Sequence, residues 1–222
     1  AHVQKINFEG KKASGIEYFL GENLSKISAN KEIILCAGSI GSPHILQVSG
    51  IGDGDKLSKI GIDLIKNLKG VGKNLQDHLM FRPVYKVKNL KSLNKKINSL
   101  FGKFLIGLEY IFNQSGPMTM GASQVCGFAK SDRSRETPNL QFHVQPISTD
   151  ILGATKLHDF DGITPTVANI RPTSRGEINI ISKNIKDNPK IKMNYLSTDD
   201  DRYVAAQGLR LVRKIMLDTE TF

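Results

Sequence analysis

The sequence predicts a mixed α/β fold, α+β over the whole chain, and three features carry that prediction. Residues 2–8 and 13–18 alternate apolar and polar side chains around a glycine turn, as the strands of a β-hairpin do. Residues 33–36 form an unbroken apolar run, which is typical of a strand buried on both faces in a parallel sheet. Residues 88–113 and 203–217 carry apolar side chains at helical spacing, which indicates amphipathic helices.

Small residues follow the apolar run, and a short helix follows them. The small residues at 37–41 would stand at the carboxyl end of a buried parallel strand, where open α/β sheets bind their cofactors. We expect Ser42 to cap the helix and Pro43 to occupy its first position, where a missing N–H costs nothing. The glycines within residues 49–52 end this helix.

The next part of the chain predicts short elements and then the long amphipathic segment. Residues 55–59 fit one or two helical turns, and residues 62–68 and 81–87 alternate like strands. Residues 88–113 predict one helix, or two helices interrupted near Gly102. We expect the apolar face of this segment to pack on a sheet, with a membrane surface as the alternative.

The loop at residues 70–78 reads GVGKNLQDH. Two glycines around a valine suit a tight turn, and Asn74 and Asp77 carry side chains that bond their own backbone in turns. We interpret His78 as a structural hydrogen-bond partner of Asp77, with a ligand or a base as the alternative.

Strands and one helix are predicted for the rest of the chain. Strands are expected at residues 125–129 and 138–146, and a turn followed by a strand within residues 169–180. Residues 191–196 and the acid-rich residues 199–201 lead to the helix at residues 203–217. Residues 149–165 are interpreted as a loop, and loops of that length tend to be functional or mobile.

The chain is basic, with 31 lysines and arginines against 21 aspartates and glutamates and a formal net charge of +10. The lysines are scattered over turns and helix faces, with one denser region at residues 86–103, so we interpret them as a solvated surface. No RNA-recognition, KH or zinc-binding pattern occurs in the sequence. A basic nucleic-acid-binding module is therefore only a remote alternative, and no nucleic-acid partner is expected.

Cysteine usage and the two ends of the chain bear on the cellular compartment. Cys36 and Cys126 lie among apolar or small residues without a CxxC pattern, which predicts free, buried thiols. No stretch reaches the roughly 18 uncharged apolar residues of a membrane span, and no secretion signal is present at the visible start. The start at Ala1 and the stop at Phe222 indicate an internal piece of a longer protein, for which a cytoplasmic location is the default expectation.

Three separated motifs resemble the glucose-methanol-choline (GMC) flavoprotein oxidoreductases, in particular choline dehydrogenase-like members. Residues 38–52 read Gly-Ser-x-x-Ser-Pro-x-Ile-Leu-x-x-Ser-Gly-Ile-Gly and resemble the second signature of the family. Residues 70–78 resemble its GVGxNLxDH segment, and residues 171–196 contain its RPxSRG and NYL elements. An ordinary strand-turn-helix with glycine caps would explain any one of the residues in the first motif, but not their joint spacing.

The resemblance implies a fold and a division into domains. Residues 1–82 would form the carboxyl-terminal part of an FAD-binding, Rossmann-like domain. Residues 83–222 would form a substrate-binding region with an antiparallel sheet and flanking helices, in which the family's carboxyl-terminal region begins at about residue 167. The Gly-x-Gly-x-x-Gly loop that binds the FAD pyrophosphate is absent from this chain.

The resemblance also implies which residues lie beside the cofactor. Val3 would offer its backbone to the adenine part of FAD, although a core-facing valine is the alternative. The residues expected to contact FAD are Val3, Cys36, Ala37, Gly38, Asn74, Asp77 and His78.

The strand at residues 138–146 resembles the family strand on the substrate side of the flavin. Gln141, His143 and Gln145 share one face of this strand. His143 is the candidate for orienting the substrate, with Gln145 beside it, and an ordinary polar strand face is the alternative. Gln124 stands where the family often has a glutamate, and a neutral amide there argues against a cationic substrate.

The activity implied is oxidation of a primary alcohol to an aldehyde, in which hydride passes to the flavin while a base takes the hydroxyl proton. The family's catalytic histidine region is not among these residues, so no catalytic base is assigned here. The parent protein is expected to be the enzyme, and this chain alone is expected to be inactive. The partners implied are FAD and a small-molecule alcohol, with the electron acceptor unknown, and a GMC-fold lyase that retains FAD is the alternative.

Overall fold

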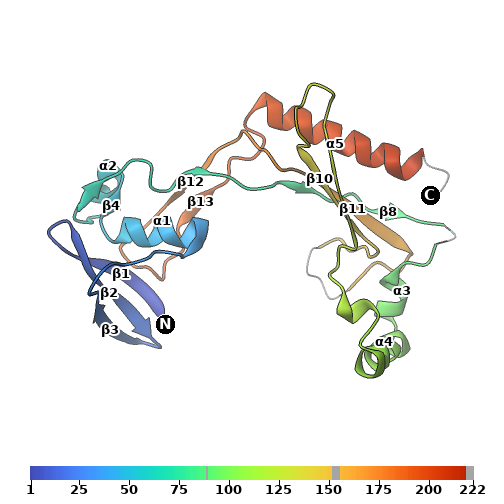
Figure 1. The fold of residues 1–222 in the computed structure, drawn as a ribbon, viewed down its shortest axis with the longest axis horizontal. Coiled ribbons are helices and arrows are strands. Elements are labelled where there is room, and N and C mark those ends of the chain that lie inside the picture. The colour runs from blue at the N-terminus through green and yellow to red at the C-terminus, as the bar shows by residue number, and fades with distance from the viewer. Residues whose placement is uncertain (89, 152–155, 219–222) are drawn as a thin grey trace. The chain divides into compact units, whose positions relative to one another are not determined.

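The computed structural model of this chain describes residues 1–88, 90–151 and 156–218 (Figure 1). The chain divides into two compact units. Unit 1 consists of Ala1–Asp77 and Ser174–Ser197, and unit 2 consists of His78–Thr173 and Thr198–Phe222. Segment 174–197 therefore returns to unit 1 after the chain has built most of unit 2.

A three-stranded antiparallel sheet opens unit 1. Its strands are β1 (His2–Glu9), β2 (Lys12–Leu20) and β3 (Asn23–Ser28), in the order β1-β2-β3. The predicted hairpin is confirmed, and Gly10 occupies its turn with a φ of 60°, which glycine adopts without strain. The sequence also predicts a second turn at residues 21–30, and this prediction is wrong because residues 23–28 form β3. Leu24 and Ile27 of β3 are both exposed, so this strand has no core-facing period that the sequence could reveal.

The apolar run at residues 33–36 is not a buried strand, and that prediction is wrong. Ile33 and Leu35 pack against the core of unit 1, while Ile34 is 76% exposed and Cys36 is exposed. A run of this kind needs neighbours on both faces, and the described residues supply them on one face only. Cys126 is exposed as well, so the expectation of two buried thiols is also wrong.

Helix α1 (Gly38–Val48) begins five residues before the predicted first position at Pro43. Ala37 is its N-cap residue and Pro43 lies inside the helix. The Ser42 hydroxyl does not cap the helix but accepts a hydrogen bond from the Ala37 N–H at 3.1 Å. The carboxyl-terminal half of α1 packs on the core of unit 1, whose buried residues are Ile6, Ile45, Val48, Leu57, Ile62, Ile180 and Ile185.

Short elements complete unit 1. Helix α2 (Gly54–Lys59) confirms the predicted helical turns. Strand β4 (Ile51–Gly52) pairs in parallel with β5 (Lys66–Asn67). Of the strand expected at residues 62–68, only β5 forms. A second antiparallel sheet has the order β13-β12-β6, with β6 at Lys73–Leu75, β12 at Gly176–Asn179 and β13 at Lys190–Lys192.

Gln47 of α1 joins this second sheet to the helix. Its side chain is buried, with 5% of the residue exposed. Its Nε2 atom donates to the Ile178 carbonyl at 2.9 Å, and its Oε1 atom accepts from the Ile180 N–H at 3.0 Å. One amide therefore satisfies two backbone groups of the chain around β12, which would otherwise be buried without partners.

Unit 2 is built on an antiparallel sheet. Its order is β7-β11-β10-β9, and β8 also pairs with β11. The strands are β7 (Met80–Phe81), β8 (Tyr85–Lys86), β9 (Val125–Ala129), β10 (Leu140–Gln145) and β11 (Gly162–Asn169). Strands β9 and β10 were predicted, and the single strand expected at 81–87 is split around Pro83, which cannot donate to a strand ladder.

Strand β11 overturns part of the loop expected at residues 149–165, of which residues 152–155 lie outside the described residues. A proline within a run argues against a central strand, yet Pro165 lies in β11, where it pairs with Val144 of β10. The loop prediction fails because the partner strands of β11 lie far away along the chain.

The helices of unit 2 are α3 (Leu93–Asn98), α4 (Leu100–Asn113), the 3₁₀ turn η1 (Pro117–Thr119) and α5 (Asp199–Leu217). The break expected near Gly102 lies at Ser99, and Asn89 of the predicted helical segment is outside the described residues. The apolar face of α4 is exposed, with Leu100 at 84%, so its expected packing on a sheet is wrong for the part described. Among the residues that the structure describes, no helix is both long enough and apolar enough to cross a bilayer.

Helix α5 covers one face of the sheet of unit 2 (Figure 1). Val204, Val212 and Met216 pack there against Leu140, Ile163 and Val167. The helix starts four residues before the predicted Tyr203, because Thr198 caps it by accepting from the Asp201 N–H at 3.2 Å.

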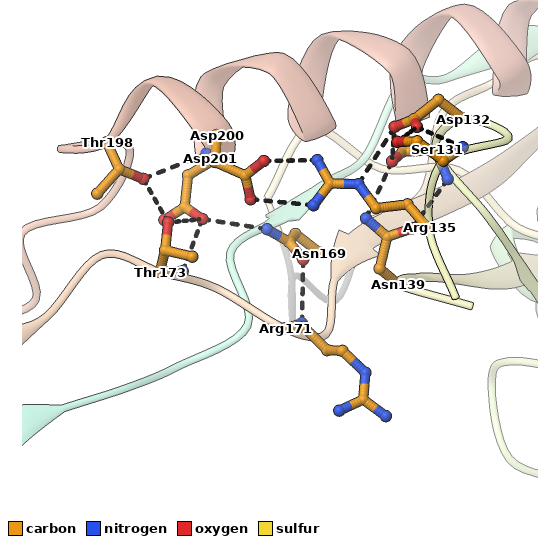
Figure 2. A network of polar contacts seen from close by, with 11 residues as sticks. Ser131, Asp132, Arg135, Asn139, Asn169, Arg171, Thr173, Thr198, Asp200 and Asp201 are labelled. Atoms are coloured by element: carbon orange, nitrogen blue, oxygen red, sulfur yellow. Dashed lines mark hydrogen bonds and ion pairs between the residues drawn. The ribbon is translucent and has the colours of Figure 1, made fainter. Parts of the chain in front are cut away.

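A polar network fixes the start of α5 (Figure 2). The Oδ1 atom of Asp201 accepts from the Thr173 N–H at 2.8 Å, from the Thr173 hydroxyl at 3.1 Å and from the Asn169 amide at 3.2 Å. Beside it, Arg135 bonds both carboxylate oxygens of Asp200 and bonds Asp132 at 3.2 Å. Hydrogen bonds from Ser134, Ser131 and Arg135 lower the pKa of Asp132 to about 2, so this carboxylate remains charged at neutral pH.

Candidate functional site

A groove in unit 1 brings two of the sequence motifs together. It has a volume of about 370 Å³, which lies within the usual range of small-molecule sites. Ser39 and Pro43 of α1 line one side, and residues 72–76 of the GVGKNLQDH loop line the other, together with Ile178. Motifs that are separated along the chain therefore share one concave surface.

The loop side of the groove is held in place by its backbone. Gly72 has a φ of 79° and its carbonyl accepts from the Ile178 N–H at 2.6 Å, which ties the loop to β12. Asn74 also lies in the left-handed region, with a φ of 61°, a conformation that asparagine tolerates better than most residues. The sequence prediction of a tight loop is confirmed, and residues 73–75 within it form β6.

The helix side of the groove presents the amino-terminal end of α1. Ala37 makes no side-chain cap, and the first turn contains no acidic residue. The first N–H groups of the helix therefore have no side-chain acceptor, and together with the helix dipole they suit a polar or anionic ligand atom. The position beside Gly38 is open, because a Cβ atom there would meet no atom within 4 Å.

The other predicted cofactor residues are distributed more widely. Cys36 immediately precedes this helix end and is exposed. Val3 lies on β1, pairs with Tyr18 and packs against the core, so it does not line the groove. Asp77 closes the first segment of unit 1, whereas His78 opens unit 2.

Asp77 bonds a residue that the sequence interpretation did not consider. Its Oδ2 atom accepts from the Tyr195 hydroxyl at 2.5 Å, where a bond to His78 was expected. Tyr195 belongs to the NYL element, so this bond joins two of the family-like motifs within unit 1. The hydrogen bond to the Asp77 carboxylate, with a smaller contribution from burial, raises the pKa of Tyr195 to about 12.

This bond predicts a titration that can be measured. Because the folded pKa of about 12 exceeds the unfolded value near 10, the bond stabilises fully below pH 10 and is lost as pH rises from about 10 to 12. Asp77→Asn should move the pKa of Tyr195 back towards 10, as followed by tyrosinate ultraviolet absorbance. Tyr195→Phe should lack the absorbance change of Tyr195 and so identifies it among the other tyrosines. Asp63→Asn, at an exposed carboxylate of the same unit, is the control and should leave the titration of Tyr195 unchanged. An unchanged titration in Asp77→Asn would contradict the assignment.

The substrate-side candidates lie on one face of the sheet of unit 2. Leu140, Ile163 and Val167 face α5, while Gln141, His143 and Gln145 of β10 belong to the opposite face. His143 stands directly opposite Cys126 of β9 and Thr166 of β11. The structure therefore places His143 and Gln145 together, as the strand alternation predicted.

Hydrogen bonds fix the edge of this polar face. The Oε1 atom of Gln145 accepts from Nη2 of Arg82 at 2.9 Å, and its Nε2 atom donates to the Ser123 hydroxyl at 3.3 Å. The Gln124 N–H donates to the Val144 carbonyl at 3.1 Å, which continues the β9–β10 register and brings Gln124 beside Gln145.

Two residues of this face were missed from the sequence. Arg82 stands between Phe81 and Pro83, and a lone cation within an alternating apolar segment is the signal that could have drawn notice to it. Thr166 lies between the loop expected at residues 149–165 and the turn expected from residue 169, so nothing in the sequence placed it opposite His143. Both positions follow from the strand register, which depends on contacts between distant segments.

Comparison with known proteins identifies the family. The family models for GMC oxidoreductase match residues 1–80 and residues 172–221, together more than half of the chain. An oxygen-dependent choline dehydrogenase from Pectobacterium atrosepticum is 36% identical over 216 residues, and one from Proteus mirabilis is 38% identical over 213 residues. These alignments cover 97% and 95% of this chain but 38% of each relative, so the chain spans less than half the length of the curated relatives it matches.

Solved structures agree on the fold. A formate oxidase superposes with a TM-score of 0.87 at 22% identity, covering 99% of this chain and 43% of that chain. An FAD-dependent oxidoreductase from Chaetomium thermophilum superposes with a TM-score of 0.80 at 24% identity, covering 97% of this chain and 43% of that chain. The fold, both family models and the close relatives agree, and this chain belongs to the GMC oxidoreductase family.

Proposed function

We propose that this chain is part of an FAD-dependent oxidoreductase that oxidises a primary alcohol to an aldehyde. The observation that carries the proposal is the groove in unit 1, where the motif of α1 meets the GVGKNLQDH loop. Family membership supports FAD as the cofactor, and the open, uncapped end of α1 beside Gly38 fits a planar, polar group.

The proposed cofactor residues divide into two sets. Ala37, Gly38 and Asn74 belong to the groove and its helix end, and would hold FAD through backbone N–H groups and a turn side chain. Cys36, Asp77, His78 and the backbone of Val3 are proposed as further contacts. When bound, FAD would supply the hydride acceptor of the reaction.

On the substrate side, the polar face of β10 is proposed to orient the alcohol. His143 and Gln145 offer an imidazole and an amide on one face, next to Gln124. Neutral amides at this edge do not attract a quaternary ammonium group, so we propose a substrate other than a choline-like cation.

The test is the absorption spectrum of the complete parent protein, purified, before and after anaerobic addition of primary alcohols, with choline among them. The expected result is a flavin band that one or more alcohols bleach. A flavin band that no alcohol bleaches would favour a lyase that retains FAD, and a protein that takes up no flavin would overturn the proposal. The 222-residue chain alone is expected to turn over no alcohol.

A pair of variants tests where the flavin binds. Ser39→Asp adds a carboxylate to the first turn of α1, which is compatible with the helix but occupies the groove and its N–H groups. We expect its flavin content to fall well below that of the unchanged protein. Ser58→Asp, on exposed α2, carries the same charge change outside the groove and should keep its flavin. Equal flavin content in both variants would contradict the assignment.

A further inference from the structure

Arg82 is half-buried, and its guanidinium has no anionic partner within the described part of the chain. Its Nη2 atom donates to the Oε1 atom of Gln145 at 2.9 Å. Among the residues that the structure describes, it forms no ion pair with any carboxylate. Arg135 of the same unit, by contrast, bonds Asp132 and Asp200. Most of the five N–H donors of Arg82 are therefore available to a ligand.

The position of Arg82 places it in the row that contains His143. Phe81 pairs with Val167 of β11, so the register continued by one residue brings Arg82 opposite Thr166. Thr166 is itself directly opposite His143 of β10. Neighbouring strands are about 4.8 Å apart, so the guanidinium and the imidazole belong to a single polar surface across three strands.

Thr166 provides an independent sign that a ligand approaches this row. The residue is 2% exposed, and its Oγ1 atom has no hydrogen-bond partner among the described residues. A buried hydroxyl without a partner is destabilising, and native proteins leave few of them. Among the described residues, a buried hydroxyl without a hydrogen-bond partner and a guanidinium without an anion therefore lie in the same row as His143, the position expected to orient the substrate.

The chemistry of these groups selects an anionic ligand. A guanidinium presents parallel N–H donors that match the two oxygens of a carboxylate, and leaving it partly buried without an anion is costly. The amide oxygen of Gln145 accepts a hydrogen bond from one of these donors and so orients the guanidinium of Arg82. A quaternary ammonium at the same place would be repelled by the positive charge.

We propose that Arg82 binds a carboxylate of the substrate, so that the alcohol oxidised is a hydroxy acid with its hydroxyl end towards His143. This inference rests on the proposed function for the reaction, but the binding of the carboxylate does not depend on turnover. Arg82 is thus a specificity-determining residue, and choline is excluded as a good substrate.

Calorimetric titration of the purified protein with butyrate tests the carboxylate site without any turnover. Butyrate should bind, and tetramethylammonium should not. Arg82→Gln should weaken butyrate binding about tenfold or more, since a hydrogen-bonded charge pair contributes about 1.5–3 kcal/mol. Arg82→Lys should recover only part of the affinity, because lysine keeps the positive charge but lacks the paired N–H donors of a guanidinium. Arg133→Gln, an exposed arginine of the same unit, makes the same charge change and should bind butyrate normally.

Flavin bleaching by 4-hydroxybutyrate, 1-butanol and choline separates the two proposals. Both proposals are supported if 4-hydroxybutyrate bleaches the flavin and if Arg82→Gln raises the KM for this substrate by a larger factor than it lowers kcat. If choline bleaches the flavin and Arg82→Gln binds butyrate as well as Arg133→Gln does, the proposed role of Arg82 is wrong. The proposed oxidoreductase function would still be supported in that case. If no alcohol bleaches the flavin, the oxidoreductase function fails, and the butyrate titration still decides whether Arg82 binds a carboxylate.

Discussion

Replacing Asp201 with alanine is expected to lower the free energy of unfolding by about 3 kcal/mol, a large share of what a single domain has. The Oδ1 atom of Asp201 accepts from the Thr173 N–H, the Thr173 hydroxyl and the Asn169 amide. Only 4% of the residue is exposed, so water would not replace this acceptor. Donors buried without a partner cost about 1–3 kcal/mol each.

Urea denaturation of matched variants measures this effect. Asp201→Asn keeps an oxygen at the Oδ1 position and should recover much of the lost stability. Asp199→Ala removes a carboxylate from the same first turn of α5, where the side chain is exposed, and should change stability little. An equal loss in Asp199→Ala and Asp201→Ala would show that charge at the helix end matters more than the buried acceptor.

The elements predicted correctly are those whose signal lies within their own residues. The β1–β2 hairpin shows alternation on both sides of a glycine turn, and α2 has an aspartate at its N-cap position that bonds the Asp55 N–H. Strands β9 and β10 also alternate over their own length. Such patterns report directly on the local backbone, so one sequence is enough to recognise them.

The elements predicted wrongly depend on partners far along the chain. Residues 33–36 have the composition of a doubly buried strand, but no described strand pairs with them. Strand β11 contains Pro165, and its residues 162–165 were expected to be loop, yet it is central because β10, β7 and β8 all pair with it. Local propensity cannot report such pairing, since tertiary contacts override it.

The candidate site, too, was predictable where its signal is local and unpredictable where it depends on distant contacts. The motifs at residues 38–52 and 70–78 were visible in the sequence, and family resemblance suggested a common cofactor. Their meeting in one groove follows from Gln47 and Gly72, which both bond the backbone of Ile178. The row of Arg82, Thr166 and His143 depends on strand register, which no local pattern specifies.

Replacing Gly72 with alanine is expected to destabilise unit 1 by at least about 3 kcal/mol. Its φ of 79° lies in the left-handed region, which costs an alanine about 1–2 kcal/mol. A Cβ atom there would also stand 2.2 Å from the Ile178 carbonyl oxygen and 2.4 Å from Nε2 of Gln47. The new methyl group would push apart the loop, α1 and β12 at the point where they are bonded together.

Gly70→Ala is the matched control, two residues earlier in the same loop. A Cβ atom at Gly70 would meet nothing within 4 Å, and Gly70 is not among the residues with positive φ. We expect urea denaturation to show a large loss for Gly72→Ala and little change for Gly70→Ala. Because the groove depends on the same junction, flavin content should fall in Gly72→Ala as well. A stable Gly72→Ala variant that keeps its flavin would mean that neither the loop nor the groove requires this close contact with β12.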